Sequence, residues 1–235
     1  GAVVRLALPQ FGGRDFGLRP VAKVAERGRK RREGLIGDRR LPGGSPGELD
    51  RDVVLAEGPS YVTALVVFRS FQAEVEHVPM DEFGLIPSAL SQHIAALTAA
   101  GRQPKFLYTV PTFNNPAGVT LSKNRRQEIL EIAQRYGILV IEDNPYGLLY
   151  FGAPAPHAIR SFSDDGVVYL GTFSKTLAPG LRVGWVLAPP IIRDKLILAN
   201  EAAILSPSSF TQLIISEYLH TADWQSQIAT FRDVY

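Results

Sequence analysis

Short apolar runs alternate along the chain with longer segments in which apolar residues recur at helical spacing. The apolar runs lie at residues 53–57, 105–110, 138–143 and 167–171. Helical spacing covers residues 62–70, 87–100 and 122–136, with Ser122 placed to cap the last helix and Gly137 to end it. Strands that are apolar throughout and alternate with helices are typical of a mostly parallel sheet covered on both faces. The pattern predicts an α/β fold with three layers.

The remaining segments extend this pattern at both ends of the sheet. Residues 74–79 alternate and 183–188 are apolar, so both predict strands, and residues 191–204 predict a helix. After a break at 206–209, one long helix is predicted from Phe210. Its apolar stripe, a core or subunit contact, comprises Phe210, Leu213, Ile214, Tyr218 and Ile228.

Candidate chemistry lies where these strands end. Ligands of open α/β sheets bind at the carboxyl ends of the strands, so the loops after Val110, Asp143 and Gly171 are expected to converge. Any α/β protein has such loops, and their side chains decide what they bind.

Lys175 lies in a loop between two apolar runs, where burial would favour the neutral amine, a nucleophile toward a carbonyl. Thr172, Ser174 and Arg182 could supply hydroxyls and a planar guanidinium to a phosphate at the same loop. A strand, loop and strand can also carry one lysine and one arginine by chance. The combination suggests a phosphorylated aldehyde joined to the lysine, for which pyridoxal phosphate is the candidate cofactor.

Asp143 ends the apolar run 138–143 and Tyr146 follows three residues later, and both side chains could bind such a cofactor. A carboxylate against the pyridine nitrogen would keep that nitrogen protonated, and a phenol could donate a hydrogen bond to the ring's O3′. The alternative is an aspartate that caps an ordinary Asn-Pro bend. The position of Lys175, 32 residues later, favours the cofactor interpretation.

At this point the chain resembles a known family. Residues 171–182 resemble the pyridoxal-phosphate lysine signature of class I/II aminotransferases, nearest the aromatic and 2-aminoadipate branch. The resemblance covers about residues 52–235. It implies the large domain of fold type I with a seven-stranded sheet, and a homodimer whose active sites lie near the subunit interface.

The resemblance also assigns roles to two further residues. Asn115 stands in a loop similar to the family's Asn-Pro-small-Gly loop, where its amide would share O3′ with Tyr146. Tyr61 matches the aromatic residue that stacks on the cofactor ring. Asn114 stands where relatives usually have glutamine, and no role is carried over to it.

Composition bears on disulfides, metal sites, membrane spans and cellular location. The 235 residues carry a net charge of +2, 46% are hydrophobic, and cysteine is absent, which rules out disulfides and thiolate metal sites. No apolar run is long enough for a membrane span, and the expected location is cytoplasmic. The four histidines show no metal-ligand spacing, and no metal is expected.

Residues 1–52 differ from the rest and stay unassigned. They hold 12 of the 25 Lys and Arg residues against 7 of the 23 Asp and Glu residues, and 10 of the 21 glycines. The basic run 27–32 could bind nucleic acid, although such runs are more often solvated. No loop for the cofactor phosphate is recognisable in this segment. Residues 53–235 are interpreted as the cofactor-binding large domain, ending before the family's small domain.

Three functions therefore remain open. The first is pyridoxal-phosphate-dependent transamination between an aromatic, branched or 2-aminoadipate-like amino acid and a 2-oxo acid such as 2-oxoglutarate. The second is a ligand-sensing domain of a DNA-binding regulator. The third is an inactive fragment.

Overall fold

The sheet is mostly parallel, as the sequence pattern predicts. The computed structural model describes residues 2–3 and 52–234. Within them the strand order is β1-β8-β7-β6-β5-β2-β3, and the two-residue β4 pairs antiparallel with the end of β3. Only β8 runs antiparallel to its neighbour β7, and the other pairs along the seven strands are parallel. The strands are β1 (Ala2–Val3), β2 (Val53–Gly58), β3 (Glu74–Asp81), β4 (Gly84–Leu85), β5 (Pro104–Thr109), β6 (Leu139–Asp143), β7 (Val167–Thr172) and β8 (Val183–Leu187).

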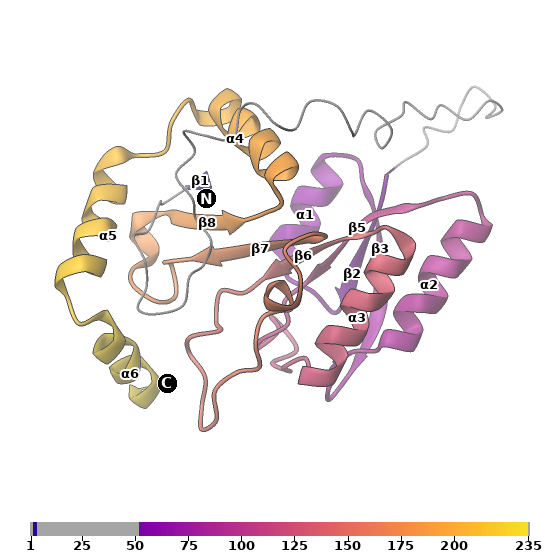
Figure 1. Cartoon of the computed structure of the whole chain (residues 1–235), viewed down its shortest axis with the longest axis horizontal. Helices are drawn as coiled ribbons and strands as arrows, with labels where there is room; N and C mark the ends of the chain where they lie inside the picture. Colours follow the sequence, from indigo (N-terminus) through magenta and orange to yellow (C-terminus); the bar gives the residue numbers. More distant parts are fainter. Residues whose placement is uncertain (1, 4–51, 235) are drawn as a thin grey trace. The chain divides into compact units, whose positions relative to one another are not determined.

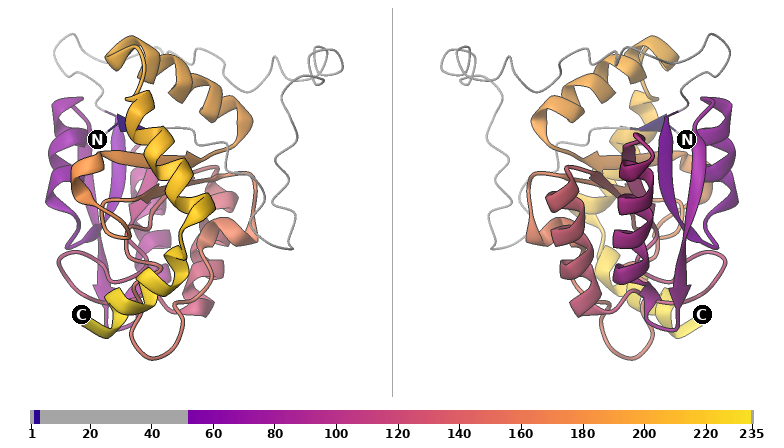
Figure 2. Two further views of the ribbon diagram at one scale, coloured as in Figure 1. Left: turned by 90° about the vertical axis from the view of Figure 1, so that its left-hand side faces the viewer. Right: turned by 90° about the vertical axis from the view of Figure 1, so that its right-hand side faces the viewer.

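Helices cover both faces of the sheet, which confirms the predicted three layers. The ring of Phe68, on α1 (Val62–Ser70), meets the rings of Phe106 and Tyr108 of β5 edge-on. Leu107, between them in sequence, faces the opposite side, where α2 (Pro87–Ala99) and α3 (Lys123–Tyr136) cover it. Figures 1 and 2 show α2 and α3 side by side, with α1 across the strands from them.

The main core lies between the sheet and the helices α2 and α3. Its members are aliphatic side chains from the strands and from one face of each helix, and almost all are fully buried. They include Leu55, Val78, Leu90, Ile94, Leu107, Ile129, Leu130, Val140 and Val167. The alternation of facing residues along each strand is what brings them to one side.

The predicted long C-terminal helix is wrong, because the chain forms two helices there. After α4 (Pro190–Ile204) come α5 (Ser209–Thr221) and α6 (Trp224–Val234). Ala222 is extended, and Asp223 accepts hydrogen bonds from the backbone N–H and the hydroxyl of Ser226, which starts a new helix. Of the predicted stripe, Ile228 is buried, whereas Phe210 and Leu213 are exposed, so these two contribute no core contact and their use in a subunit contact stays a prediction.

The start of α3 differs from prediction in one detail. Ser122 occupies the N-cap position, but its side chain makes no capping hydrogen bond. Gly137 ends the helix with φ +66°, as its place in the sequence suggests. Within the described residues no helix is long and apolar enough to cross a membrane. The basic segment at residues 27–32 lies outside the described part of the chain.

Arg126 of α3 is buried and joins the loops that follow β5 and β6. Its guanidinium donates to the carbonyls of Leu121, Pro111 and His157 and to the hydroxyl of Thr112, at 2.7 to 3.3 Å. The carboxylate of Glu142 lies 3.8 Å away, and both side chains have no exposed surface. Burial lowers the pKa of Arg126, while the neighbouring carboxylates oppose that shift. The hydrogen bonds keep a buried cation in place and fix both loops.

We expect Arg126→Met to lower the free energy of unfolding by about 3 to 5 kcal/mol, because it leaves Glu142 and several carbonyl groups without their buried partner. Urea unfolding followed by circular dichroism measures this loss. Arg135→Met changes an exposed arginine of the same helix and is expected to cost less than about 0.5 kcal/mol. Equal midpoints for the two variants would contradict the role given to Arg126.

Candidate functional site

The carboxyl ends of four neighbouring strands meet at one edge of the sheet. The register pairs Ala56 of β2 with Tyr108 of β5, Thr109 with Glu142 of β6, and Asp143 with Leu170 of β7. The loops that follow these strands therefore leave from the same edge. They carry the predicted residues Tyr61, Asn115, Asp143 with Tyr146, and Lys175.

Asp143 ends β6 as a largely buried carboxyl group, on the face that α1 covers. Its Oδ2 accepts a hydrogen bond of 2.6 Å from the phenol of Tyr108. Burial raises the pKa of Asp143, and the bond from Tyr108 acts against that rise. Burial and the adjacent carboxylate raise the pKa of Tyr108, so its phenol keeps the proton that it donates. The other oxygen, Oδ1, has no hydrogen-bond partner among the described residues, and it could accept from a ligand.

Asn115 lies exposed in the loop after β5, next to a buried neighbour. Asn114 is 2% exposed, and its amide donates to the carboxylate of Glu57 at 2.7 Å. The same loop contacts the loop after β6, where the rings of Phe113 and Phe151 have centroids 5.7 Å apart. The predicted convergence of these two loops is therefore seen directly.

Lys175 lies in the turn between β7 and β8, but the expectation that it is buried is wrong. Its side chain is exposed, because the turn continues beyond the sheet edge. Thr172 shapes this turn, since its hydroxyl accepts from the N–H of Ser174 at 3.1 Å. Phe173 anchors it from beneath, in a second core cluster with Val183 and Ile215 of α5. The amine is thus held at the edge of the sheet and is free to meet a ligand.

Arg182 ends the same turn in the left-handed conformation, with φ +55°. Its guanidinium is exposed and makes one long bond of 3.4 Å, to the carbonyl of Pro179. Behind the turn, Gly171 lies under the ring of Trp185, and a Cβ at this position would overlap that ring. The close approach explains why glycine precedes the predicted phosphate-binding residues Thr172 and Ser174.

The two predicted tyrosines lie on the neighbouring loops. Tyr61 precedes α1 and keeps 38% of its surface exposed, so its ring is accessible. Tyr146 is half-buried in the loop after β6, which α6 also holds. Arg232 of α6 donates to the carbonyl of Leu148 and lies 3.8 Å above the ring centroid of Tyr150.

Sequence reasoning missed the three residues that hold the site from behind. Glu57 lies near the end of an apolar strand, which is the same signal that drew attention to Asp143. Tyr108 is a polar ring within an apolar strand, but its partner lies 35 residues away. Asn114 was noted and given no role, although its amide anchors the loop.

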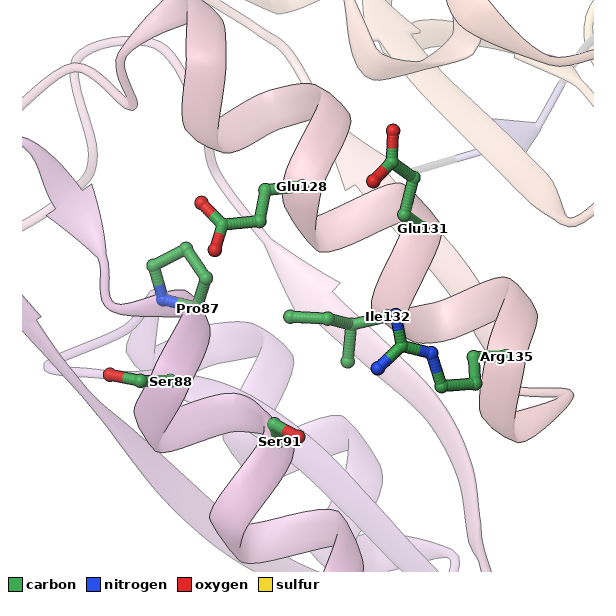
Figure 3. A pocket seen from close by; sticks show the side chains of 7 residues that line it. All are labelled: Pro87, Ser88, Ser91, Glu128, Glu131, Ile132 and Arg135. Carbon is green, nitrogen blue, oxygen red and sulfur yellow. The ribbon is translucent and has the colours of Figure 1, made fainter.

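A hollow of about 320 Å³ lies away from this edge, between α2 and α3 (Figure 3). Its lining comes from two outward-facing helix surfaces and mixes two acids with one arginine. The side chains are those of Pro87, Ser88, Ser91, Glu128, Glu131, Ile132 and Arg135. None of them belongs to the strand ends, so the hollow plays no part in the candidate site. The described residues also hold no cluster of acids and histidines arranged for a metal ion.

A parallel sheet with a carboxylate, an amide and a lysine at adjacent strand ends is typical of proteins that bind an aromatic phosphorylated cofactor. The family profile of aminotransferase class I and II matches residues 48–233. The chain belongs to this family, in its aromatic, kynurenine and 2-aminoadipate branch.

Individual relatives agree with this placement. Aromatic-amino-acid aminotransferase 1 of Thermococcus litoralis is 39% identical over 72% of this chain and 40% of its own length. The 2-aminoadipate transaminase of Thermus thermophilus is 34% identical over 97% of this chain and 55% of its own length. The crystal structure of Pyrococcus horikoshii kynurenine aminotransferase superposes with a TM-score of 0.77 at 36% identity, over 79% of this chain and 46% of that one. The chain thus spans about half the length of these relatives.

One further relative belongs to another functional class. The uncharacterized helix-turn-helix transcriptional regulator YdfD of Bacillus subtilis is 34% identical over 80% of this chain and 38% of its own length.

The family uses pyridoxal phosphate, and the residues of this edge fit that cofactor. Asp143 offers an oxygen with no partner in the described chain, at the depth of the strand ends. Lys175 and Arg182 are exposed at the next loop, and they carry an amine that suits an aldehyde and a guanidinium that suits a phosphate. The accessible ring of Tyr61 could stack on a pyridine.

We expect Tyr108→Phe to raise the pKa of Asp143 further, because the variant removes the hydrogen bond that opposes the effect of burial. A ¹³C NMR titration of the aspartate carboxyl groups measures the shift. A carboxyl whose pKa is raised on folding binds its proton more tightly in the native state. Stability is therefore lost as pH rises from the unfolded value near 3.8 through the folded value, and the variant should widen that window.

Tyr136→Phe is the control for this titration, because the Tyr136 ring packs against the core on the face that α3 covers. It should leave the pKa of Asp143 unchanged. A pKa of Asp143 that stays at the wild-type value in Tyr108→Phe would contradict the assigned hydrogen bond.

Proposed function

We propose that the whole protein catalyses pyridoxal-phosphate-dependent transamination between an amino acid and a 2-oxo acid. The observation that carries the proposal is the pairing of β6 with β7. It sets the Asp143 carboxyl group beside the strand that leads into the Lys175 turn. One group suits the ring nitrogen of the cofactor, and the other suits its aldehyde.

When bound, pyridoxal phosphate supplies an electron sink for negative charge at the α-carbon of the amino acid. In our proposal, Asp143 holds a proton at the pyridine nitrogen through its unpaired oxygen, while Tyr108 keeps the other oxygen in place. Asn115 and Tyr146 donate to O3′, and Tyr61 stacks on the ring. These residues orient the cofactor against the edge of the sheet.

The Lys175 turn has two tasks in this proposal. Arg182, Thr172 and Ser174 bind the phosphate. Lys175 would hold the aldehyde, and its amine, once free, would move the proton at the α-carbon of the amino acid. Its exposed position at the sheet edge supports this task, because the amine needs room to leave and return.

The relatives support a substrate class. Their names indicate aromatic amino acids, kynurenine and 2-aminoadipate, so we propose donors of this kind with an acceptor such as 2-oxoglutarate. We further propose a homodimer. Exposed apolar side chains on α1, α4 and α5 support it, among them Val62, Phe71, Ile191, Phe210 and Leu213.

Lys175→Ala is expected to abolish transamination and to leave pyridoxal phosphate bound only non-covalently, because Lys175 is the amine of the turn between β7 and β8 that the proposal assigns to the aldehyde. The amino-acid-dependent release of 2-oxo acid and dialysis of the loaded protein measure the two effects. Lys195→Ala removes an exposed lysine of α4 and should keep both properties. Turnover of Lys175→Ala at the wild-type rate would refute the assignment.

The similarity to a helix-turn-helix regulator supports a second candidate, in which this domain senses a ligand for a DNA-binding module. Duplex DNA titrated at low and at moderate salt tests it. Phosphate contacts predict binding that weakens steeply as salt is added. No binding of the protein at low salt would exclude the regulator, whereas steep salt dependence without transamination would favour it.

A further inference from the structure

Glu57 is a fully buried acid that the proposed chemistry does not use. It lies one residue before the end of β2 with 1% of its surface exposed, and it accepts three hydrogen bonds. The donors are the hydroxyl of Thr109 at 2.6 Å, the backbone N–H of Val110 at 2.8 Å and the amide of Asn114 at 2.7 Å. Two of these bonds reach the end of β5, and the third reaches the loop beyond it.

The loop that contains Asn115 is closed around Asn114. The backbone N–H of Asn114 donates to the carbonyl of Val119, its carbonyl accepts from Gly118, and its side-chain oxygen accepts from the N–H of Ala117. Residues 115–118 are themselves exposed. With so little apolar contact of its own, the tip of the loop takes its position from the buried Asn114, and Asn114 takes its position from Glu57.

The sheet does not need Glu57 in order to form. Backbone pairing already joins β2 to β5, and an isolated carboxyl group is costly to bury. Burial raises the pKa of Glu57, and its three hydrogen bonds act against that rise. An apolar residue would end the strand more simply, so the carboxyl group is explained by what it holds rather than by the core.

We propose that Glu57 is a positioning residue for the cofactor site: through Asn114 it fixes residues 114–118, and so the place of Asn115 at the sheet edge, whereas Arg126 holds Pro111 and Thr112. It also lies near the end of the strand that leads into Tyr61, and thus joins two of the loops that face the cofactor. The inference rests on the proposed function only for the identity of the ligand, because the coupling between Glu57 and the loop is a property of the chain itself.

Two substitutions of Glu57 distinguish the loss of the hydrogen-bond acceptors from the loss of the negative charge alone. Glu57→Ala removes all three acceptors. Glu57→Gln keeps them in part, because its carbonyl can accept from Val110 and Asn114 while its NH₂ donates to Thr109, whose hydroxyl can reverse its role. Asn114→Ala removes the bond to Glu57 together with the bond from Ala117, leaves the bonds from Thr109 and Val110 in place, and keeps the test available should Glu57→Ala fold poorly. Leu90→Ala, in the core under α2, is the control for destabilisation in general.

The first readout is amide hydrogen exchange in the full chain without cofactor, comparing residues 114–118 with α3. Glu57→Ala and Asn114→Ala should speed exchange at 114–118 by about tenfold relative to α3, whereas Glu57→Gln and Leu90→Ala should leave that ratio near the wild-type value. Unchanged relative exchange at 114–118 in both Glu57→Ala and Asn114→Ala would overturn the proposal.

The second readout is the dissociation constant for pyridoxal phosphate, from the visible absorption of the bound cofactor. Glu57→Ala and Asn115→Ala should weaken binding by a similar factor, about tenfold, with Glu57→Gln and Leu90→Ala within about threefold of wild type. Wild-type affinity in Glu57→Ala would overturn the link to the site. If the wild-type protein binds no pyridoxal phosphate, the proposed function fails, and the exchange ratio alone decides whether Glu57 positions the loop.

Discussion

The loops of this site depend on buried carboxyl groups near the carboxyl ends of β2 and β6. Glu57, Glu142 and Asp143 lie where an apolar sheet ends, and burial raises the pKa of each. Each therefore needs hydrogen-bond donors, and the chain supplies them from different segments. Glu57 binds the end of β5 and its loop, Glu142 binds the backbone N–H groups of Ile159 and Arg160, and Asp143 binds Tyr108. The acids of the sheet thus hold the loops at this edge together with Arg126, which donates to the loops after β5 and β6.

The three buried carboxyl groups differ in how far the chain itself satisfies their oxygens. Both oxygens of Glu57 and of Glu142 accept hydrogen bonds from the chain. Asp143 has one oxygen bound to Tyr108 and one without a partner in the described chain. A carboxyl group that is half satisfied by its own protein is suited to a ligand with a protonated ring nitrogen, whereas the other two are suited to holding backbone.

The sequence predicted the strands and most helices well, because an apolar run bounded by turn residues has few alternatives. The boundaries of α1 were found to the residue, and Gly137 ends α3 as expected. The break at Ala222 and Asp223 was missed, since helical spacing runs on through it and only a local cap ends the helix there.

The site, too, could be predicted only in part from the sequence. Adjacent strand ends could be predicted from topology, but the bond from Tyr108 to Asp143 and the burial of Asn114 depend on distant segments meeting. The exposure of Lys175 depends on how far its turn extends past the sheet, and the spacing of apolar residues in the sequence does not predict that extent.

In our proposal, this edge holds pyridoxal phosphate with its aldehyde at Lys175. Borohydride reduction of the wild-type protein mixed with the cofactor, followed by peptide mapping by mass spectrometry, tests this directly. We expect one stoichiometric pyridoxyl group, in the peptide that contains Lys175. Labels spread over surface lysines such as Lys123 and Lys195, with Lys175 no more modified than they are, would contradict it.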